Sequence, residues 1–129
     1  MLQVQTTKGV SSIDGIGVFA AADITKGSVI WRFTPGIDLL LTKEELDRLS
    51  PIERAHILHY CYLWRKAMRY IVCADDARFF NHSDTPNARV VQDDTGTTIA
   101  ARNIFLGEEL TCDYEELDAS DRTEFDNES

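Results

Sequence analysis

Short apolar runs separated by Gly, Pro and polar turn residues recur along most of the chain and predict a mostly β, irregular fold. We expect strands at Leu2–Thr6 at an edge, Gly17–Ala22, Ser28–Phe33, Ile37–Leu41, Met68–Cys73, Ala88–Gln92, Thr97–Ala101 and Glu109–Tyr114, the last as a short strand or a loop. Between two of these runs, Asp93–Gly96 predicts a hairpin turn, because Gly readily supplies a positive φ.

The middle of the chain is predicted to be helical, because two capping boxes stand there, at Thr42–Glu45 and Ser50–Glu53. Pro51 occupies the first helical position of the second box, where its missing N–H costs nothing. The residues that then share one face at helical spacing are Ile52, Ala55, His59 and Tyr62. We therefore expect a helix from about Pro51 to about Trp64, inside a helical insert of about residues 42–66.

Two stretches of the chain resemble each other. ADITKGSVI (22–30) parallels ARNIFLGEEL (101–110), and the matching pairs are Ile24 with Ile104, Gly27 with Gly107, and Ile30 with Leu110. Both stretches predict an extended arm, a tight turn and a strand. Two copies are too few for a solenoid, which needs about three or more repeats.

Length and charge narrow the class of protein. At 129 residues the chain is expected to form one domain. The net charge is −9, and Glu115–Ser129 holds seven acidic residues and one Arg, so most of the charge lies in this tail. The tail is either a solvated, partly disordered end or a surface that attracts a basic protein substrate. The sequence has no basic stripe, which argues against nucleic acid as a direct ligand.

Cysteine usage and the N-terminus predict a cytoplasmic protein. Cys61, Cys73 and Cys112 are an odd number without a short spacing, which fits reduced thiols better than a disulfide framework. The N-terminus lacks the apolar core and cleavage pattern of a signal peptide. No run approaches the ~18 apolar residues of a membrane span, so we expect no membrane association.

Several motifs leave alternatives open. RFFNHSDTPNA (78–88) could be a turn, a glycosylation site, a metal site or the floor of a ligand pocket; its sequon, Asn81–Ser83, carries no weight without secretion. Gly15–Gly17 is either a plain tight turn or a place where the backbone approaches a ligand closely.

Two further clusters lie in the helical region. His56 and His59, with Cys61 just beyond and Cys73 further on, could bind a metal ion or be ordinary helix residues. An aromatic concentration follows: Tyr60, Tyr62, Trp64 and Tyr70. These rings either pack in the core or line a channel for an apolar-stemmed or cationic group.

Three motifs in one order resemble the SET-domain family of protein-lysine methyltransferases. They are GIGVFA (15–20), RFFNHSDTPNA (78–88) and GEELTCDY (107–114), and the resemblance spans about Val4 to Tyr114. It implies a β-clip SET fold for residues 1–114, in which several small β-sheets surround the helical insert. The segment carrying Asn81 and His82 would lie beside Glu109–Tyr114 in a knot-like crossing, a rare exception to unknotted connections.

The resemblance also implies an activity. The chain would transfer a methyl group from S-adenosyl-L-methionine to the side-chain amine of a lysine in a protein substrate, on a flexible and basic segment. Cofactor contacts are expected from Asp14, Ile16, Gly17, Arg78, Asn81, His82, Tyr114 and Phe125. Phe125 would stack on adenine, and Tyr114 would lie where the methyl group and the lysine amine meet. Tyr62 would be a second catalytic tyrosine in the substrate channel.

Two departures from the family pattern leave alternatives open. Family members often carry a Cys-rich segment that binds zinc and completes the lysine channel, but none follows Tyr114, so no metal is expected. The tail (115–129) or a partner must then complete the site, and the protein is expected to be a monomer or a homodimer that shares residues between its copies. Cys112 stands where Phe or Tyr is usual; its small side chain favours multiple methylation unless another residue fills the space. The alternatives to an active enzyme are a non-catalytic SET-like module that binds a basic protein segment, and a metal-dependent protein built on His56, His59 and Cys61.

Overall fold

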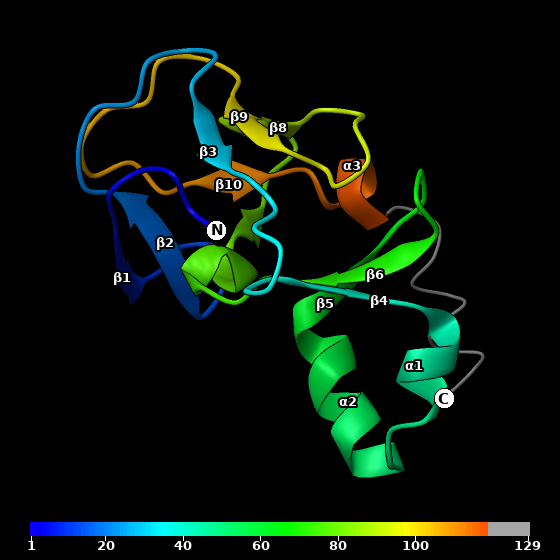
Figure 1. Cartoon of the computed structure of the whole chain (residues 1–129). Helices are drawn as coiled ribbons and strands as arrows, with labels where there is room; N and C mark the ends of the chain where they lie inside the picture. The colour runs from blue at the N-terminus through cyan, green and yellow to red at the C-terminus, as the bar shows by residue number, and fades with distance from the viewer. Residues whose placement is uncertain (119–129) are drawn as a thin grey trace.

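Four small β-sheets and three short α-helices make up residues 1–118, the part of the chain that the computed structural model describes (Figure 1). The strands are β1 (Thr6–Val10), β2 (Ile16–Ala20), β3 (Val29–Trp31), β4 (Leu39–Leu41), β5 (Cys61–Trp64), β6 (Arg69–Val72), β7 (Asn81–His82), β8 (Ala88–Val90), β9 (Thr98–Ala100) and β10 (Thr111–Cys112). The helices are α1 (Lys43–Asp47), α2 (Pro51–Tyr60) and α3 (Tyr114–Asp118), with a 3₁₀ helix, η1 (Asp76–Phe79). The predicted mostly β fold with a helical insert is confirmed.

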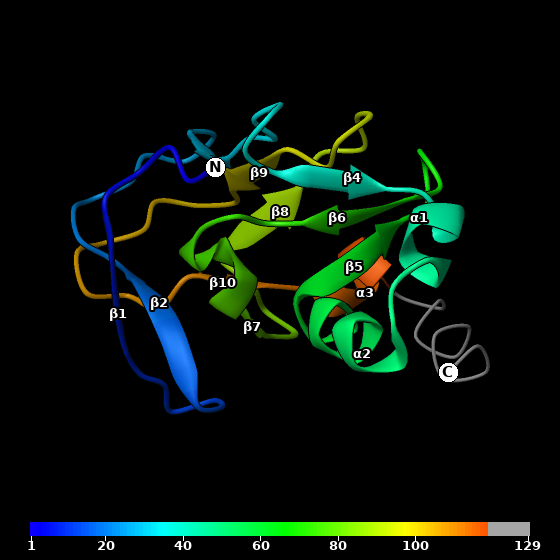
Figure 2. The same ribbon diagram turned by 60° about the horizontal axis from the view of Figure 1, so that its bottom comes forward.

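The sheets are arranged around a central pair of strands. β1 and β2 form an antiparallel pair, β7 and β10 form a parallel pair, and the other sheets have the strand orders β3-β9-β8 and β4-β6-β5. In both views the β1–β2 sheet and the helices α1 and α2 lie at opposite ends of the molecule, with β7 and β10 between them (Figure 1 and Figure 2). No helix among residues 1–118 combines the length and the apolar character that crossing a bilayer requires.

Both predicted capping boxes are present, and they begin α1 and α2. The second helix is shorter than predicted, since α2 ends at Tyr60 and not near Trp64. Residues 61–64 form β5 instead, because pairing with β6 buries Cys61, Leu63 and Trp64. Apolar burial in a sheet therefore overrides the helical spacing that the sequence shows over this stretch.

The two ends of the domain also differ from the prediction. The N-terminal edge strand is Thr6–Val10 and not Leu2–Thr6, because Leu2 instead bridges Trp31 and packs on the core. The last expected strand is divided into β10 and α3, so Tyr114 begins a helix. The hairpin of β8 and β9 is confirmed, and Gly96 in its turn has a φ of 68°.

The two similar stretches pair with each other through matching hydrogen bonds. The amides of Ile24 and Ile104 each donate to the other residue's carbonyl, over 2.7 and 2.8 Å. Two further pairs of bonds, all of 2.8 Å, are equivalent in the same way. Gly27 N donates to Ala100 O, as Gly107 N does to Ala20 O. Lys26 N donates to Asn103 Oδ1, as Leu106 N does to Asp23 Oδ1. The stretches are thus related by an approximate two-fold axis, and each satisfies the polar backbone of the other.

As expected, the segment that carries Asn81 and His82 lies beside the segment Glu109–Tyr114. Asn81 pairs with Thr111 and His82 with Cys112 in parallel, and the flanking Phe80, Leu110 and Cys112 are buried in the largest apolar cluster. The knot-like threading of these segments stays a prediction.

A buried carboxylate ties the N-terminal segment to the β4–β6 sheet. The Asp38 side chain is fully inaccessible to solvent. Its Oδ2 accepts a hydrogen bond from Thr34 N over 2.9 Å and lies 2.8 Å from the Met1 amine. Its Oδ1 accepts a hydrogen bond from Ala74 N over 2.9 Å. Burial raises the pKa of Asp38, but the hydrogen bonds from the Met1 amine, Ala74 and Thr34 together lower it below its ordinary value of 3.8.

We expect Asp38→Asn to lower the free energy of unfolding by about 1–3 kcal/mol at neutral pH, because the neutral amide accepts less strongly and leaves a buried donor without a partner. Since the folded state lowers the pKa of Asp38, the carboxylate contribution is complete above about pH 3.8 and is lost as the pH falls through the lower folded value. Urea denaturation across the acidic range measures both effects, and the difference between the two proteins should shrink at the acidic end.

The matched control is Asp94→Asn, which makes the same chemical change on the exposed hairpin turn. This control should change the free energy of unfolding by less than about 0.5 kcal/mol. If the free energy of unfolding of the Asp38→Asn variant stayed lower by the same amount down to the lowest pH, the proposed role of the charge would be contradicted.

Candidate functional site

The side-chain amide of Asn81 joins three segments that are far apart in the sequence. Its Nδ2 donates to the carbonyls of Asp14 and Ile16, over 3.0 and 3.3 Å, and to Glu109 Oε2 over 2.8 Å. Asn81 is buried in β7, so these bonds are largely shielded from water. The loop before β2, strand β7 and the segment before β10 are therefore held together at one point.

Glu109 is the second part of this junction. Its carboxylate accepts from Ser11 Oγ, over 2.8 Å to Oε1 and 2.9 Å to Oε2, as well as from Asn81. A Cβ at Gly17 would lie only 2.4 Å from Glu109 Oε2, so the close approach of this carboxylate requires glycine. Glu109 stands in the GEELTCDY motif, but the sequence alone did not predict its role.

His82 and Tyr114 form a second contact between the same segments. Tyr114 N donates to His82 Nδ1 over 3.1 Å, and the rings lie 5.2 Å apart. Because Nδ1 accepts, the ring proton lies on Nε2, which donates to Asp84 Oδ1 over 2.9 Å. The Tyr114 hydroxyl donates to Phe80 O over 2.8 Å, so both ends of this tyrosine are anchored to the β7 segment.

The larger of two adjoining cavities has a volume of about 440 Å³. Its wall combines the backbone loop Asp14–Ile16 with the segment Arg78–Asn81 and the aromatic rings of Tyr60 and Tyr114. This volume falls in the range of about 300–1,000 Å³ that small-molecule sites occupy.

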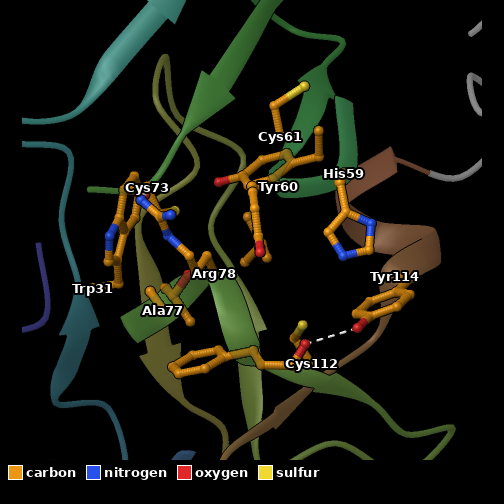
Figure 3. A pocket seen from close by; sticks show the side chains of 13 residues that line it. Trp31, His59, Tyr60, Cys61, Cys73, Ala77, Arg78, Cys112 and Tyr114 are labelled. Atoms are coloured by element: carbon orange, nitrogen blue, oxygen red, sulfur yellow. Dashed lines mark hydrogen bonds between the residues drawn. The ribbon is translucent and has the colours of Figure 1, made fainter. Parts of the chain in front are cut away.

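The smaller cavity has a volume of about 110 Å³ and a largely aromatic and sulfur-containing wall (Figure 3). Its aromatic rings include Trp31, Tyr60, Tyr62, Phe80 and Tyr114, and all three cysteines, Cys61, Cys73 and Cys112, border it. None of the Asp and Glu side chains within residues 1–118 lines it. The cavity therefore suits an apolar stem better than a charged group.

The two cavities share one wall. The residues that border both are His59, Tyr60, Arg78, Phe80 and Tyr114. Figure 3 shows His59, Tyr60 and Tyr114 directed into the same space, with the Tyr114 hydroxyl in its hydrogen bond. A group bound in one cavity can thus meet a group bound in the other beside Tyr114.

Arg78 and Tyr60 stabilise this shared wall. The guanidinium of Arg78 lies 4.9 Å from the centre of the Tyr60 ring, and its Nη2 donates to Cys73 O over 3.0 Å. A cation over an aromatic face at this distance is a favourable contact. The positive charge of Arg78 is therefore fixed between the two cavities.

Cys73 and Cys112 are neutral thiols in this setting. Burial, followed by the nearby charges of Glu116 and Asp113, raises the pKa of Cys112 to about 12, and burial also raises the pKa of Cys73. Neither thiol is therefore a nucleophile at neutral pH. No group of three His, Cys, Asp or Glu side chains within residues 1–118 is placed to hold a metal ion, so the structure does not assemble the metal site considered for His56, His59 and Cys61.

The structure brings most of the predicted site residues to the two cavities. Arg78 and Tyr114 border both cavities; Asp14, Ile16 and Asn81 border the larger one; and Tyr62 and Cys112 border the smaller one. Gly17 and His82 border neither; His82 contacts Tyr114, and Gly17 faces Glu109. Phe125 lies outside the described residues, and its stacking on adenine stays a prediction.

Four residues of this region were missed from the sequence. His59, Tyr60 and Phe80 line the shared wall, and Glu109 anchors Asn81. Glu109 had a signal, since it stands in the GEELTCDY motif. Tyr60 had a weaker one, as part of the aromatic concentration, but the sequence does not distinguish it from Tyr62.

Residues 15–115 match the SET domain family, and the chain therefore belongs to that family. Two curated relatives are histone-lysine N-methyltransferases by name. The H3 lysine-36-specific protein of Saccharomyces cerevisiae is 33% identical over 108 residues, which cover 78% of this chain and 14% of that protein. Histone-lysine N-methyltransferase 2D of Homo sapiens is 32% identical over 114 residues, which cover 81% of this chain and 2% of that protein. The chain thus spans only a small part of the length of either relative.

Solved structures show the same fold. A putative histone methyltransferase of Plasmodium falciparum matches with a TM-score of 0.61 and 24% identity, over 88% of this chain and 95% of that one. A Neurospora SET domain protein described as a histone lysine methyltransferase matches with a TM-score of 0.60 and 25% identity, over 88% of this chain and 53% of that one.

We expect Gly17→Ala to lower the free energy of unfolding by about 1–3 kcal/mol, because the new methyl group must displace the Glu109 carboxylate from Ser11 and Asn81. The double variant Gly17→Ala/Glu109→Ala should lose less than the sum of the two single variants, since the clash is then removed. Chemical denaturation of the unchanged protein, the two single variants and the double variant measures the free energies of unfolding that this comparison needs.

The matched control is Gly9→Ala on the adjacent strand, where the added Cβ would meet only the Phe19 ring at 3.4 Å. It should change stability by less than about 1 kcal/mol. Strict additivity in the Gly17 and Glu109 cycle would show that the two residues are not coupled.

Proposed function

We propose that the chain catalyses methyl transfer from S-adenosylmethionine to the side-chain amine of a lysine in a protein. The observation that carries the proposal is the shared wall: two cavities of different character meet beside Tyr114. The names of the relatives, which are histone-lysine methyltransferases, support a protein lysine as the acceptor.

The residues of the larger cavity fit the proposed cofactor. Its volume suits a nucleoside-sized ligand, the Asp14–Ile16 loop forms part of its wall, and Arg78 offers a cation for a carboxylate. Aromatic rings at Tyr60 and Phe79 supply apolar faces. When bound, S-adenosylmethionine supplies a methyl group on a positively charged sulfur, which is a good leaving group without a metal.

The smaller cavity suits the lysine side chain. Lysine has a pKa of about 10.4, so reaching the neutral, nucleophilic amine at pH 7 costs about 4.6 kcal/mol. A wall of aromatic rings and neutral thiols, with the positive Arg78 nearby, disfavours the ammonium form and lowers that cost.

Tyr114 and Phe80 can hold the amine for attack. The Tyr114 hydroxyl is fixed by its bond to Phe80 O at the place where the cavities meet. A phenol oxygen and a backbone carbonyl side by side can accept N–H bonds from the amine and orient its lone pair toward the larger cavity. Alignment of reacting groups is worth several kcal/mol in enzymes.

A basic segment is the proposed context of the target lysine. The chain carries a net charge of −9, which attracts a positively charged partner at moderate salt. Histones are one class of protein with such segments, and they are the substrates that the relatives' names indicate.

The direct test incubates the protein with methyl-labelled S-adenosylmethionine and either core histones or a cell lysate. We expect label in protein, at lysine, by mass spectrometry. Absence of transfer together with absence of cofactor binding by calorimetry would overturn the proposal. Cofactor binding without any transfer would favour the alternative, a non-catalytic module that binds a basic segment.

We expect Tyr114→Phe to lower kcat by about 100-fold, since removing one positioned polar group at a reacting centre typically costs this much. The lost bond to Phe80 O should lower stability by only about 0.5–1.5 kcal/mol, so the variant should remain folded. The labelled-cofactor assay and a thermal melt measure the two effects.

The matched control is Tyr70→Phe, because Tyr70 is buried on β6 and borders neither cavity. It should retain most of the activity. Equal rates for the unchanged protein and the Tyr114→Phe variant would remove Tyr114 from the reaction.

A further inference from the structure

His59 has a position that the proposed function leaves unexplained. It stands in the last turn of α2, its ring lies 4.8 Å from the Tyr60 ring in an edge-on contact, and it borders both cavities. Figure 3 shows its imidazole directed into the same space as Tyr114. The same side chain is also exposed to water. The imidazole therefore connects the shared wall with solvent.

The other titratable groups at this wall are poor proton acceptors near neutral pH. Arg78 is a permanent cation, and Tyr60 and Tyr114 carry phenols, which ordinarily hold their proton up to a pH of about 10. The thiols of Cys73 and Cys112 are already protonated, because burial raises their pKa values. Cys61 is buried and borders only the smaller cavity.

Within the described part of the chain, no carboxylate stands on the shared wall to accept a proton. Asp14 borders only the larger cavity, and the two acidic groups nearest Cys112, Asp113 and Glu116, border neither. Imidazole is the side chain that ordinarily changes its protonation state between pH 5 and 8. His59 is thus the group on the shared wall whose ordinary chemistry suits it to accept a proton.

We propose that His59 accepts the proton that the substrate lysine must lose, an inference that rests on the proposed function. One N–H bond of the ammonium breaks, its proton forms a new N–H bond on the imidazole, and the amine keeps the electron pair. Because His59 is exposed, the imidazolium then releases the proton to water. The fixed charge of Arg78 on the same wall favours the neutral form of the amine throughout.

The test compares His59→Gln with the unchanged protein in the labelled-cofactor assay on core histones, across a range of pH. At about pH 7 we expect kcat/KM to fall by about 100-fold, the lower end of the range that general base catalysis supplies. The deficit should shrink toward about pH 9.5, where an increasing fraction of lysine is neutral without help. A residue that only supported the structure would give a deficit independent of pH.

His56→Gln is the matched control. His56 is exposed on the same helix and borders neither cavity, so the same substitution there should leave the rate and its pH dependence unchanged. A substrate peptide in which thialysine replaces lysine adds a chemical rescue. Its amine is less basic, so the His59→Gln deficit should be smaller on it.

A binding readout complements the kinetics. The chain has three histidines, whose imidazole NMR signals can be assigned with the His→Gln variants. Addition of n-butylamine, a mimic of the lysine side chain, should shift the His59 signal and leave the His56 signal in place.

The outcomes separate the two proposals. Methyl transfer by the unchanged protein, with equal pH profiles for it and for His59→Gln, would overturn the role of His59 and leave the proposed function standing. An unmoved His59 signal at saturating n-butylamine would also overturn this role. No transfer by the unchanged protein would overturn the proposed function and this inference together.

Discussion

The fold depends most on one buried amide. Asn81 donates to two carbonyls of the loop before β2 and to the carboxylate of Glu109, so three segments that are distant in sequence share one polar centre. A buried donor without its partners costs about 1–3 kcal/mol, which makes the arrangement close to all-or-none. Glu109 in turn approaches so closely that the Cβ of any other residue at position 17 would have to displace its carboxylate. The three motifs of the sequence are therefore one structural unit.

The helical insert contributes the other half of the site. α2 ends at Tyr60 because the next residues pair with β6, and this transition places His59 and Tyr60 at the shared wall and Tyr62 in the smaller cavity. Arg78 then packs on Tyr60 from the opposite segment. The end of the surface helix α2 thus supplies one side of the same small space, η1 and α3 supply the other, and neither side alone forms it.

Short sequence motifs predicted the parts of this site that depend only on residues adjacent in the chain. Asn81 and Tyr114 stand inside recognisable motifs, and the caps of both helices followed from four-residue patterns. The end of α2 was not predictable, because it is decided by burial against β6, which helical spacing does not reveal. The choice of Tyr62 over Tyr60 rested on the family resemblance alone; Tyr62 borders the smaller cavity, and Tyr60 borders both. The sequence indicated His59 only as a candidate metal ligand, since its neighbours at the shared wall lie on η1 and α3, far from it in the sequence.

The approximate two-fold pairing of residues 22–30 with residues 101–110 has a consequence for how the chain folds. Neither stretch can satisfy its backbone until the other is in place, and a long loop must close before the first of these bonds forms. The parallel pair of β7 and β10 adds contacts of similarly long range. Proteins with such high contact order fold slowly for their size. During this delay the apolar strands are exposed, so this small domain depends on the rate of loop closure to avoid aggregation.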